Sequence, residues 1–233
     1  MFLFNEFINP RSNRAIFFLP SVRSKPIYPY YPRISWANEL NSYYNVFYIA
    51  DPYQNEDVYK DSGGSWFISP SGVSCLNELS SFIKDLCVKH ALDEILFYGS
   101  SMGGYASICL SMMHNNSMAI SECPQLFLDK HPGSRHVLNT NNILSSTYAP
   151  LSFYDETCKP NSIKMVCSIH DRHYQTHVLP FIEEVKDKSI AISFSIHLFS
   201  SEKYPTGHVA LNKDDAINMI HSCFDTIPNE KVV

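Results

Sequence analysis

A glycine-rich turn between two apolar runs is the feature of this sequence that most restricts its fold. In the stretch FYGSSMGGYAS, residues 97–107, one apolar run ends, two serines follow, and a second apolar run begins. The chain of 233 residues has only eight glycines, and three of them surround these serines. The motif consists of Gly99, Ser100, Ser101, Met102, Gly103 and Gly104. Because glycine carries no Cβ and lets backbone segments approach closely, we predict a sharp turn from a strand into a helix here.

Short apolar runs with many β-branched and aromatic residues recur along the chain. They lie at 15–19, 45–50, 94–99, 117–121, 163–169 and 190–199. Continuous runs of this kind are typical of strands covered on both faces. Two helical patterns accompany them, with apolar stripes at Leu76, Leu79, Ile83, Leu86 and Cys87 and at Val209, Ala216, Ile220 and Phe224. The alternation predicts an α/β fold, in which helices cover both faces of a mostly parallel central sheet.

Charge and cysteine content exclude several classes of function. The formal net charge is −5 and no basic stripe is present, so no nucleic-acid partner is expected. No run approaches the ~20 apolar residues that a membrane-spanning helix needs, and the first residues lack the basic start of a signal peptide. The seven cysteines are odd in number and contain no CxxC pair. We interpret them as reduced packing residues of a cytoplasmic protein.

The glycine motif matches G-x-S-x-G, the pattern that exposes a nucleophilic serine on a strand-to-helix turn. Ser101 is the serine at that position, and the free N–H groups at the start of the following helix favour a developing negative charge. The amide of Met102 is the expected first oxyanion donor. The alternative is a glycine-rich turn of a nucleotide-binding unit with two capping serines. Neither G-x-x-x-x-G-K-[ST] nor G-x-G-x-x-G is present, which disfavours phosphate binding.

A nucleophilic serine requires a histidine base and an acid that orients it. Asp171 lies two residues after the apolar run 163–169, and it is the preferred acid. Asp155 and Glu156 are the alternatives. His208, beside Gly207, follows the last run and precedes the last helical pattern, and it is the preferred base.

Three other histidines crowd around the predicted acid, and we expect them to face solvent or the pocket rim. They are His170, His173 and His177. A histidine cluster beside an acid also raises the alternative of a zinc site. The stretch HDRHYQTH lacks the HExxH spacing, however, so neither a metal nor another cofactor is expected.

The glycine motif, Asp171 and Gly207-His208, in this order, resemble a compact α/β-hydrolase over about residues 15–226. More narrowly, FYGSSMGGYAS followed by ISECPQLFL resembles small serine hydrolase-like proteins encoded among bacterial capsule and surface-polysaccharide genes. A more distant resemblance is to the accessory secretion protein that O-acetylates glycans. The resemblance implies a single α/β-hydrolase-like domain over 1–233. Residues 126–162 then either connect strands or hold a small cap.

The resemblance also implies a second oxyanion donor in the loop after the run 15–19. The family's usual His-Gly is absent there, and LPSVR stands in its place. Pro20 has no N–H, so the donor is expected to be the amide of Ser21 or Val22. Without the usual His-Gly, the second oxyanion donor differs from that of the family, and efficient ester hydrolysis depends on this donor.

The predicted function is acyl transfer through an acyl-enzyme on Ser101, from a small-molecule or glycan ester or thioester. Water as acceptor makes the protein an esterase, and a sugar hydroxyl makes it an O-acyltransferase. The aromatic residues of the loop 20–44 are compatible with sugar stacking or with plain packing. The alternatives are a non-catalytic protein of the same fold that binds a partner or glycan, and a small serine peptidase.

Overall fold

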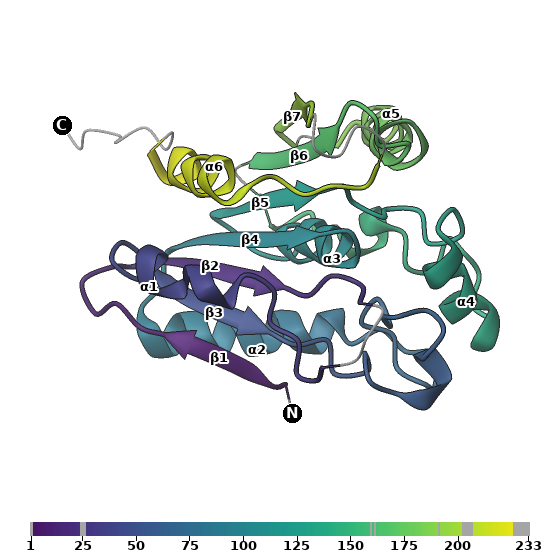
Figure 1. Ribbon diagram of the computed structural model, residues 1–233, viewed down its shortest axis with the longest axis horizontal. Helices are drawn as coiled ribbons and strands as arrows, with labels where there is room; N and C mark the ends of the chain where they lie inside the picture. The colour runs from purple at the N-terminus through teal and green to yellow at the C-terminus, as the bar shows by residue number, and fades with distance from the viewer. Residues whose placement is uncertain are drawn as a thin grey trace.

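The apolar runs pair into one seven-stranded sheet in the computed structural model, which describes residues 2–23, 27–158, 160, 162–190, 192–201 and 207–225. The strands are β1 (Phe4–Phe7), β2 (Arg14–Leu19), β3 (Asn45–Ile49), β4 (Glu94–Ser100), β5 (Ser117–Glu122), β6 (Ser162–Ser168) and β7 (Phe194–Phe199). Their spatial order is β1-β3-β2-β4-β5-β6-β7 (Figure 1). Strand β1 is antiparallel to β3, and the other neighbours are parallel. The predicted mostly parallel sheet is confirmed.

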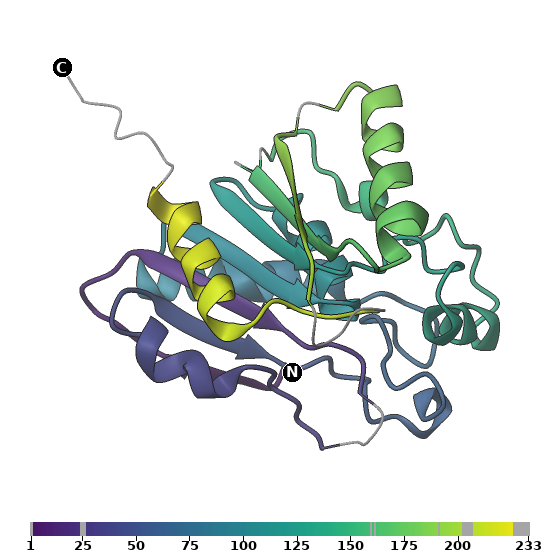
Figure 2. The same cartoon turned by 45° about the horizontal axis from the view of Figure 1, so that its top comes forward.

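Helices cover both faces of this sheet, as the strand pattern predicts. The α-helices are α1 (Ala37–Leu40), α2 (Leu76–His90), α3 (Met102–Ser111), α4 (Pro132–Thr140), α5 (Leu179–Asp187) and α6 (Lys213–Asp225). Four short helical turns join them: η1 (Ile34–Trp36), η2 (Asp57–Tyr59), η3 (Pro150–Phe153) and the π-helical η4 (Tyr174–Val178). Figure 2 shows α1 and the yellow α6 on one side of the sheet.

Alternating side chains of the central strands supply the two halves of the core. Phe17 of β2 packs with residues of α2 and α3, whereas its neighbour Phe18 packs with residues of α1 and α6. Each ring stacks on an aromatic ring of β3, at centroid distances of 4.7 Å to Phe47 and 4.8 Å to Tyr48. Every residue of β3 and β5 is buried. Such two-sided burial is why these runs are apolar throughout.

Two sequence expectations about elements are wrong, and one strand was not predicted. That strand is the edge strand β1, which has only four residues, and its two central residues, Asn5 and Glu6, are polar. Strand β7 lies at the other edge and is mostly exposed, including Ile196 and Leu198, rather than covered on both faces. The last helix begins at Lys213, so Val209 lies in the preceding loop and not on the helical stripe.

The segment between β5 and β6, which includes α4, packs against the rest of the chain. The Trp66 ring lies 2.8 Å from the position that a Cβ on Gly133 of α4 would take. Leu128, Val137 and Leu138 join the core cluster that contains α2 and α3. The segment therefore packs on the same face of the sheet as α2 and α3 (Figure 1).

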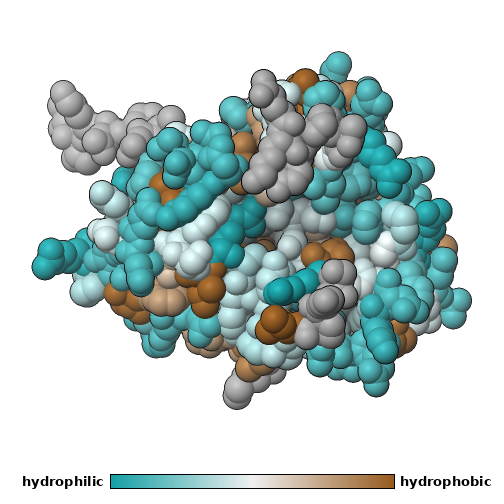
Figure 3. All heavy atoms as spheres, viewed as in Figure 1, coloured by the Kyte–Doolittle hydropathy of each residue, from teal (hydrophilic) through white to brown (hydrophobic). Residues whose placement is uncertain are grey.

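The surface seen in Figure 3 is largely hydrophilic, with separate apolar patches. Among the described residues, no helix has the length and apolarity to span a bilayer. All seven cysteines lie in this described part, and six of them are buried, which fits their interpretation as packing residues.

Candidate active site

Ser101 occupies a strained turn between β4 and α3. Its backbone angles are φ 59° and ψ −116°, in a region that residues with a Cβ rarely adopt. Its N–H donates to the carbonyl of Glu122 (2.8 Å), and its carbonyl accepts from Tyr105 (3.1 Å) in the first turn of α3. The side chain is 6% exposed. Main-chain hydrogen bonds from β5 and α3 therefore hold the strained conformation in place.

The glycines of the motif allow close backbone contacts that a side chain would prevent. A Cβ on Gly99 would lie 2.2 Å from the carbonyl oxygen of Gly103. One on Gly103 would lie 2.7 and 2.8 Å from the carbonyl oxygens of Leu19 and Pro20, after β2. At Gly104 it would meet the Ser121 hydroxyl of β5 at 2.9 Å. The turn thus seats α3 directly on the ends of three strands.

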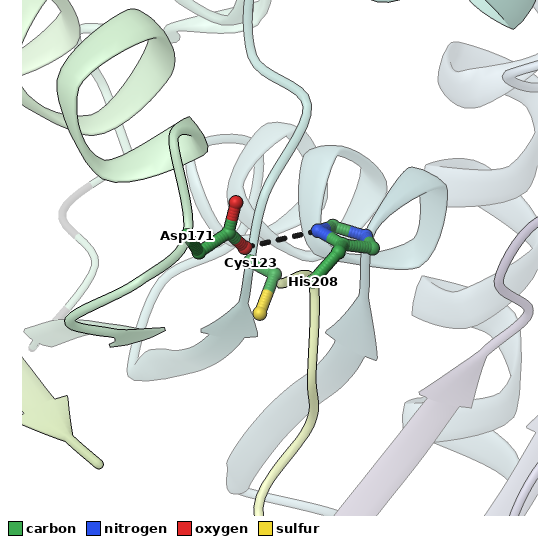
Figure 4. Close-up of side chains that lie close together, drawn as sticks. All are labelled: Cys123, Asp171 and His208. Atoms are coloured by element: carbon green, nitrogen blue, oxygen red, sulfur yellow. Dashed lines mark hydrogen bonds and ion pairs between the residues drawn. The ribbon is translucent and has the colours of Figure 1, made fainter. Parts of the chain in front are cut away.

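His208 and Asp171 come from two different loops: Asp171 follows β6, and His208 lies between β7 and α6. His208 Nδ1 lies 3.0 Å from Asp171 Oδ2 (Figure 4). The carboxylate is 5% exposed, and its second oxygen accepts the N–H of His173 at 2.8 Å. Burial alone raises the pKa of Asp171, but these hydrogen bonds and the neighbouring imidazoles lower it to about 2. An ionised carboxylate only accepts hydrogen bonds, so the proton of neutral His208 is on Nδ1 and its Nε2 lone pair is available.

Ser101 and His208 line one pocket of about 350 Å³. The other lining residues are Ser21, Val22, Ser100, Cys123, Gln125, His131, Val209 and Ala210. Ser101 and His208 share the pocket without a direct hydrogen bond among the described side chains, an arrangement common where no substrate is bound. A second pocket, of about 310 Å³, adjoins His208 on the side of Asp171, and His131 lines both.

The predicted oxyanion donors lie around the same pocket. Met102 is the first residue of α3, where main-chain N–H groups have no acceptor within the helix. Ser21 and Val22 line the pocket with Ser101. Gln54 fixes their loop, because its Nε2 donates to the carbonyl of Ser21 at 2.9 Å.

Two of the histidines near the acid are buried and do not face solvent; His173 lines the second pocket, as expected, whereas His177 lines neither pocket. His170 is exposed, but His173 and His177 are 5% and 0% exposed. His173 Nδ1 lies 2.8 Å from His208 Nδ1, and the two rings are nearly perpendicular. Burial, with the charge of neighbouring imidazoles, lowers the pKa of His173 to about 4 and that of His177 to about 3. His177 lies in the π-helical turn η4 and His173 directly precedes it, a geometry that residue spacing does not reveal.

A buried ion pair beneath the pocket was also missed. Arg33 pairs with Glu122 at the end of β5, and its Nη1 lies 3.4 Å from the Ser100 hydroxyl. The Glu122 carboxylate also accepts from the Tyr98 hydroxyl (2.8 Å) and from the Leu211 N–H (3.1 Å). Burial raises the pKa of Glu122, and the Arg33 guanidinium opposes that shift. One carboxylate therefore links the serine turn to the loop that carries the histidine. The signal in the sequence is a charged residue that ends an otherwise uncharged apolar run.

Cys123, Asp171 and His208 offer donor atoms that lie within 4.8 Å of one another (Figure 4). Two of these atoms are already hydrogen-bonded to each other. The thiol of Cys123 donates to the Val209 carbonyl at 2.9 Å, and a hydrogen bond with Cys167 and burial raise its pKa. A metal binds the thiolate, so these groups fit a hydrogen-bonded acid and base better than a metal centre.

The alternative acids are not brought to the pocket. Asp155 and Glu156 are exposed. The Asp155 carboxylate accepts from the main-chain N–H and the hydroxyl of Thr157, at 2.8 and 2.6 Å, and so stabilises its own turn. Among the acids considered from the sequence, the structure pairs only Asp171 with His208 in the part of the chain that it describes.

The aromatic loop contributes to a separate pocket. Tyr28 and Tyr30 line a cavity of about 320 Å³, and the Arg23 guanidinium lies 4.5 Å from the centroid of the Tyr30 ring. Trp36 is 9% exposed and packs edge-to-face on Phe18. Plain packing therefore accounts for Trp36.

Known structures share this arrangement of elements. The capsule O-acetyltransferase of Neisseria meningitidis serogroup A superimposes with a TM-score of 0.63 and 21% identity, over 97% of this chain and 89% of that one. A histidine-to-alanine variant of that enzyme in complex with CoA superimposes with a TM-score of 0.64. The S-formylglutathione hydrolase of Agrobacterium tumefaciens gives 0.60 at 13% identity, over 96% and 88% of the chains.

A third similar structure is FphF, a fluorophosphonate-binding serine hydrolase of Staphylococcus aureus, with a TM-score of 0.56 and 15% identity over 91% of this chain and 82% of that one. No protein-family model matches the chain, and no curated protein sequence matches it. The structural likeness shows that the chain has the α/β-hydrolase fold.

Proposed function

We propose that this protein is a serine-dependent acyl-transfer enzyme with Ser101, His208 and Asp171 as its catalytic triad. The observation that carries the proposal is the shared pocket: a serine on a strained turn faces the same cavity as a histidine that a buried carboxylate orients. This is the arrangement that serine acyl transfer uses on several unrelated folds.

In the proposed mechanism, Ser101 Oγ attacks the carbonyl carbon of an ester or thioester while His208 Nε2 accepts the hydroxyl proton. Asp171 stabilises the imidazolium that forms. The main-chain N–H of Met102, with that of Ser21 or Val22, stabilises the tetrahedral oxyanion. The intermediate collapses, the leaving alcohol or thiol takes the proton from His208, and an acyl-enzyme on Ser101 remains.

The second half-reaction decides between two activities. The similar capsule O-acetyltransferase, which has a known CoA complex, supports a CoA thioester as donor and a glycan hydroxyl as acceptor. The similar S-formylglutathione hydrolase supports water as acceptor. We favour O-acyl transfer to a glycan or polysaccharide precursor in the cytoplasm, with hydrolysis as the second candidate. Non-catalytic binding does not require an ionised acid, a histidine and a strained serine around one pocket.

The proposal is tested by labelling with a fluorophosphonate probe, which reacts with an activated serine. We expect the wild-type protein to be labelled at Ser101, and Ser101→Ala to lose both labelling and hydrolysis of p-nitrophenyl acetate. Ser100→Ala is the matched control, because its hydroxyl is one residue away and contacts Arg33. Loss of labelling in Ser100→Ala with retention in Ser101→Ala would show that the turn presents the other serine.

A further inference from the structure

Gln125 lies beside the proposed nucleophile and has no part in the mechanism above. It follows β5 by three residues, is 1% exposed, and lines the pocket with Ser101 and His208. Main-chain hydrogen bonds fix the short segment that carries it. The N–H of Cys123 donates to the carbonyl of Val166 (2.7 Å), and the N–H of Gln125 is 3.4 Å from the carbonyl of Ser101. The carboxamide is thus held at a set position relative to the strained turn.

The carboxamide oxygen of Gln125 is buried and lacks a hydrogen-bond partner among the residues that the structure describes. An unsatisfied buried acceptor costs about 1–3 kcal/mol. His131 also lines this pocket, and its Nδ1 is likewise buried without a hydrogen-bond partner among the described residues. Burial, with neighbouring positive charges, lowers the pKa of His131 to about 4, so its ring is neutral at pH 7. Two polar groups around the pocket are therefore available to a ligand.

We propose that Gln125 and His131 form the binding site for a hydroxyl-rich acyl acceptor, a carbohydrate, and that Gln125 Oε1 accepts a hydrogen bond from a hydroxyl next to the one that reacts. The inference rests on the proposed function. An acyl group and its carbonyl have no hydrogen to donate to a buried acceptor, whereas a sugar offers several hydroxyls. A carboxamide oxygen also cannot stabilise an oxyanion, so this group suits the acceptor and not the acylation step.

The step that the site serves is deacylation. The acceptor hydroxyl attacks the acyl carbonyl on Ser101, and His208 Nε2 takes its proton. The bond from Ser101 Oγ to the acyl carbon breaks, Ser101 regains the proton from His208, and the ester of the acceptor leaves. A sugar held on Gln125 displaces water from the pocket, which favours transfer over hydrolysis.

The test compares two half-reactions in the same protein. With p-nitrophenyl acetate as donor, the pre-steady-state burst of p-nitrophenol measures acylation. The yield of acetylated product with methyl hexosides or with methanol measures transfer. In the wild-type protein we expect transfer to a methyl hexoside to saturate with concentration and to exceed transfer to methanol at equal molarity.

Gln125→Met should keep the burst and lose at least ten-fold of the hexoside transfer, with methanol transfer unchanged. Gln125→Leu repeats the test with different packing, and Gln175→Met, at an exposed position in η4, should match the wild-type protein.

Each other outcome rejects an identifiable statement. A wild-type burst with unsaturable transfer, equal for hexosides and methanol, would overturn the acceptor site alone. A burst that falls as much as the transfer in both Gln125 variants would assign the carboxamide to acylation instead. Absence of any p-nitrophenol release above the uncatalysed rate in the wild-type protein would reject the proposed function, and the acceptor site with it.

Discussion

The two halves of the candidate site are built differently. The serine half lies in the middle of the sheet, where all ten residues of α3 are buried and main-chain hydrogen bonds hold Ser101. The histidine half lies toward an edge. His208 is in the loop between β7, whose central residues are exposed, and α6, and side chains position it: Asp171, His173 and, through Leu211, Glu122.

This difference separates a rigid part from an adjustable one. The partners of Ser101 are main-chain groups of Glu122, Tyr105 and Gln125, which no single side-chain substitution removes without moving the backbone. The partners of His208 are single side chains, 35 and 37 residues away in the sequence, that can each be removed. Substitutions of the glycines in the serine half should therefore affect folding, whereas those in the histidine half should affect catalysis with the fold retained.

The largest expected effect is that of Asp171→Asn on turnover. The amide no longer stabilises the imidazolium and does not fix the Nδ1–H tautomer of His208, and in serine proteases this change costs ~10⁴ in rate. We expect a loss of that order in steady-state hydrolysis of p-nitrophenyl acetate, with the fold retained. Asp155→Asn, at an exposed turn, is the control and should behave as the wild-type protein. The reverse pattern would move the acid to residues 155–156.

The second prediction concerns stability in the serine half. Gly103→Ala places a Cβ 2.7 Å from the carbonyl oxygen of Leu19, and neither backbone segment can move freely. Overpacking of this kind costs ~1–3 kcal/mol, and we expect the upper end, measured by urea unfolding. Gly64→Ala is the matched control. Its Cβ would lie 2.6 Å from Met102 Sδ, the end of a flexible side chain that can move away, so the cost should be small. Equal losses would show that the turn is no more rigid than its surroundings.

The same division explains what the sequence could predict. The strand-to-helix turn is local: its residues are adjacent in the chain, and the apolar runs on either side identify the strand and the helix. The placement of Asp171 and His208 after successive strands was predictable too, since parallel strands end at the same edge of a sheet. Their catalytic roles, and a single domain over 1–233, remain predictions.

Contacts between distant segments were not predictable from the sequence. Arg33 and Glu122 are 89 residues apart, and no periodicity connects them. His173 and His177 were expected to face solvent or the pocket rim because they follow a strand in a polar stretch. Both are buried, His177 within the π-helical turn η4 and His173 directly before it. Gln125 stood out only as part of a motif resemblance, since its position beside Ser101 depends on the pairing of β4 with β5.

The smallest expected effect tests whether His173 helps to position His208. The two Nδ1 atoms share one hydrogen, and Asp171 requires it to be on His208, so His173 Nδ1 is the acceptor and its ring must be neutral. Removing one of two acceptors costs ~0.5–1.5 kcal/mol, so we expect His173→Phe to slow the acylation burst roughly two- to ten-fold. His177→Phe keeps a buried ring that has no hydrogen bond to His208 in the described structure, and His170→Ala changes an exposed side chain, so both should retain the wild-type burst.

A pH series tests whether His173 is held neutral in the folded protein, as a hydrogen-bond acceptor must be. The pKa of His173 is about 4 in the folded protein and ~6.5 in an unfolded chain. Between these values the unfolded chain binds a proton that the folded protein does not, so the contribution of His173 to stability is complete above pH ~6.5 and is lost as the pH falls toward 4. The free energy of unfolding of His173→Phe should therefore decrease less over this window than that of the wild-type protein, by part of the ~1.4 kcal/mol per pH unit that one proton is worth. An unchanged pH dependence of unfolding in His173→Phe would show that His173 is not held neutral in the folded protein, and would contradict its role as the acceptor of the His208 hydrogen.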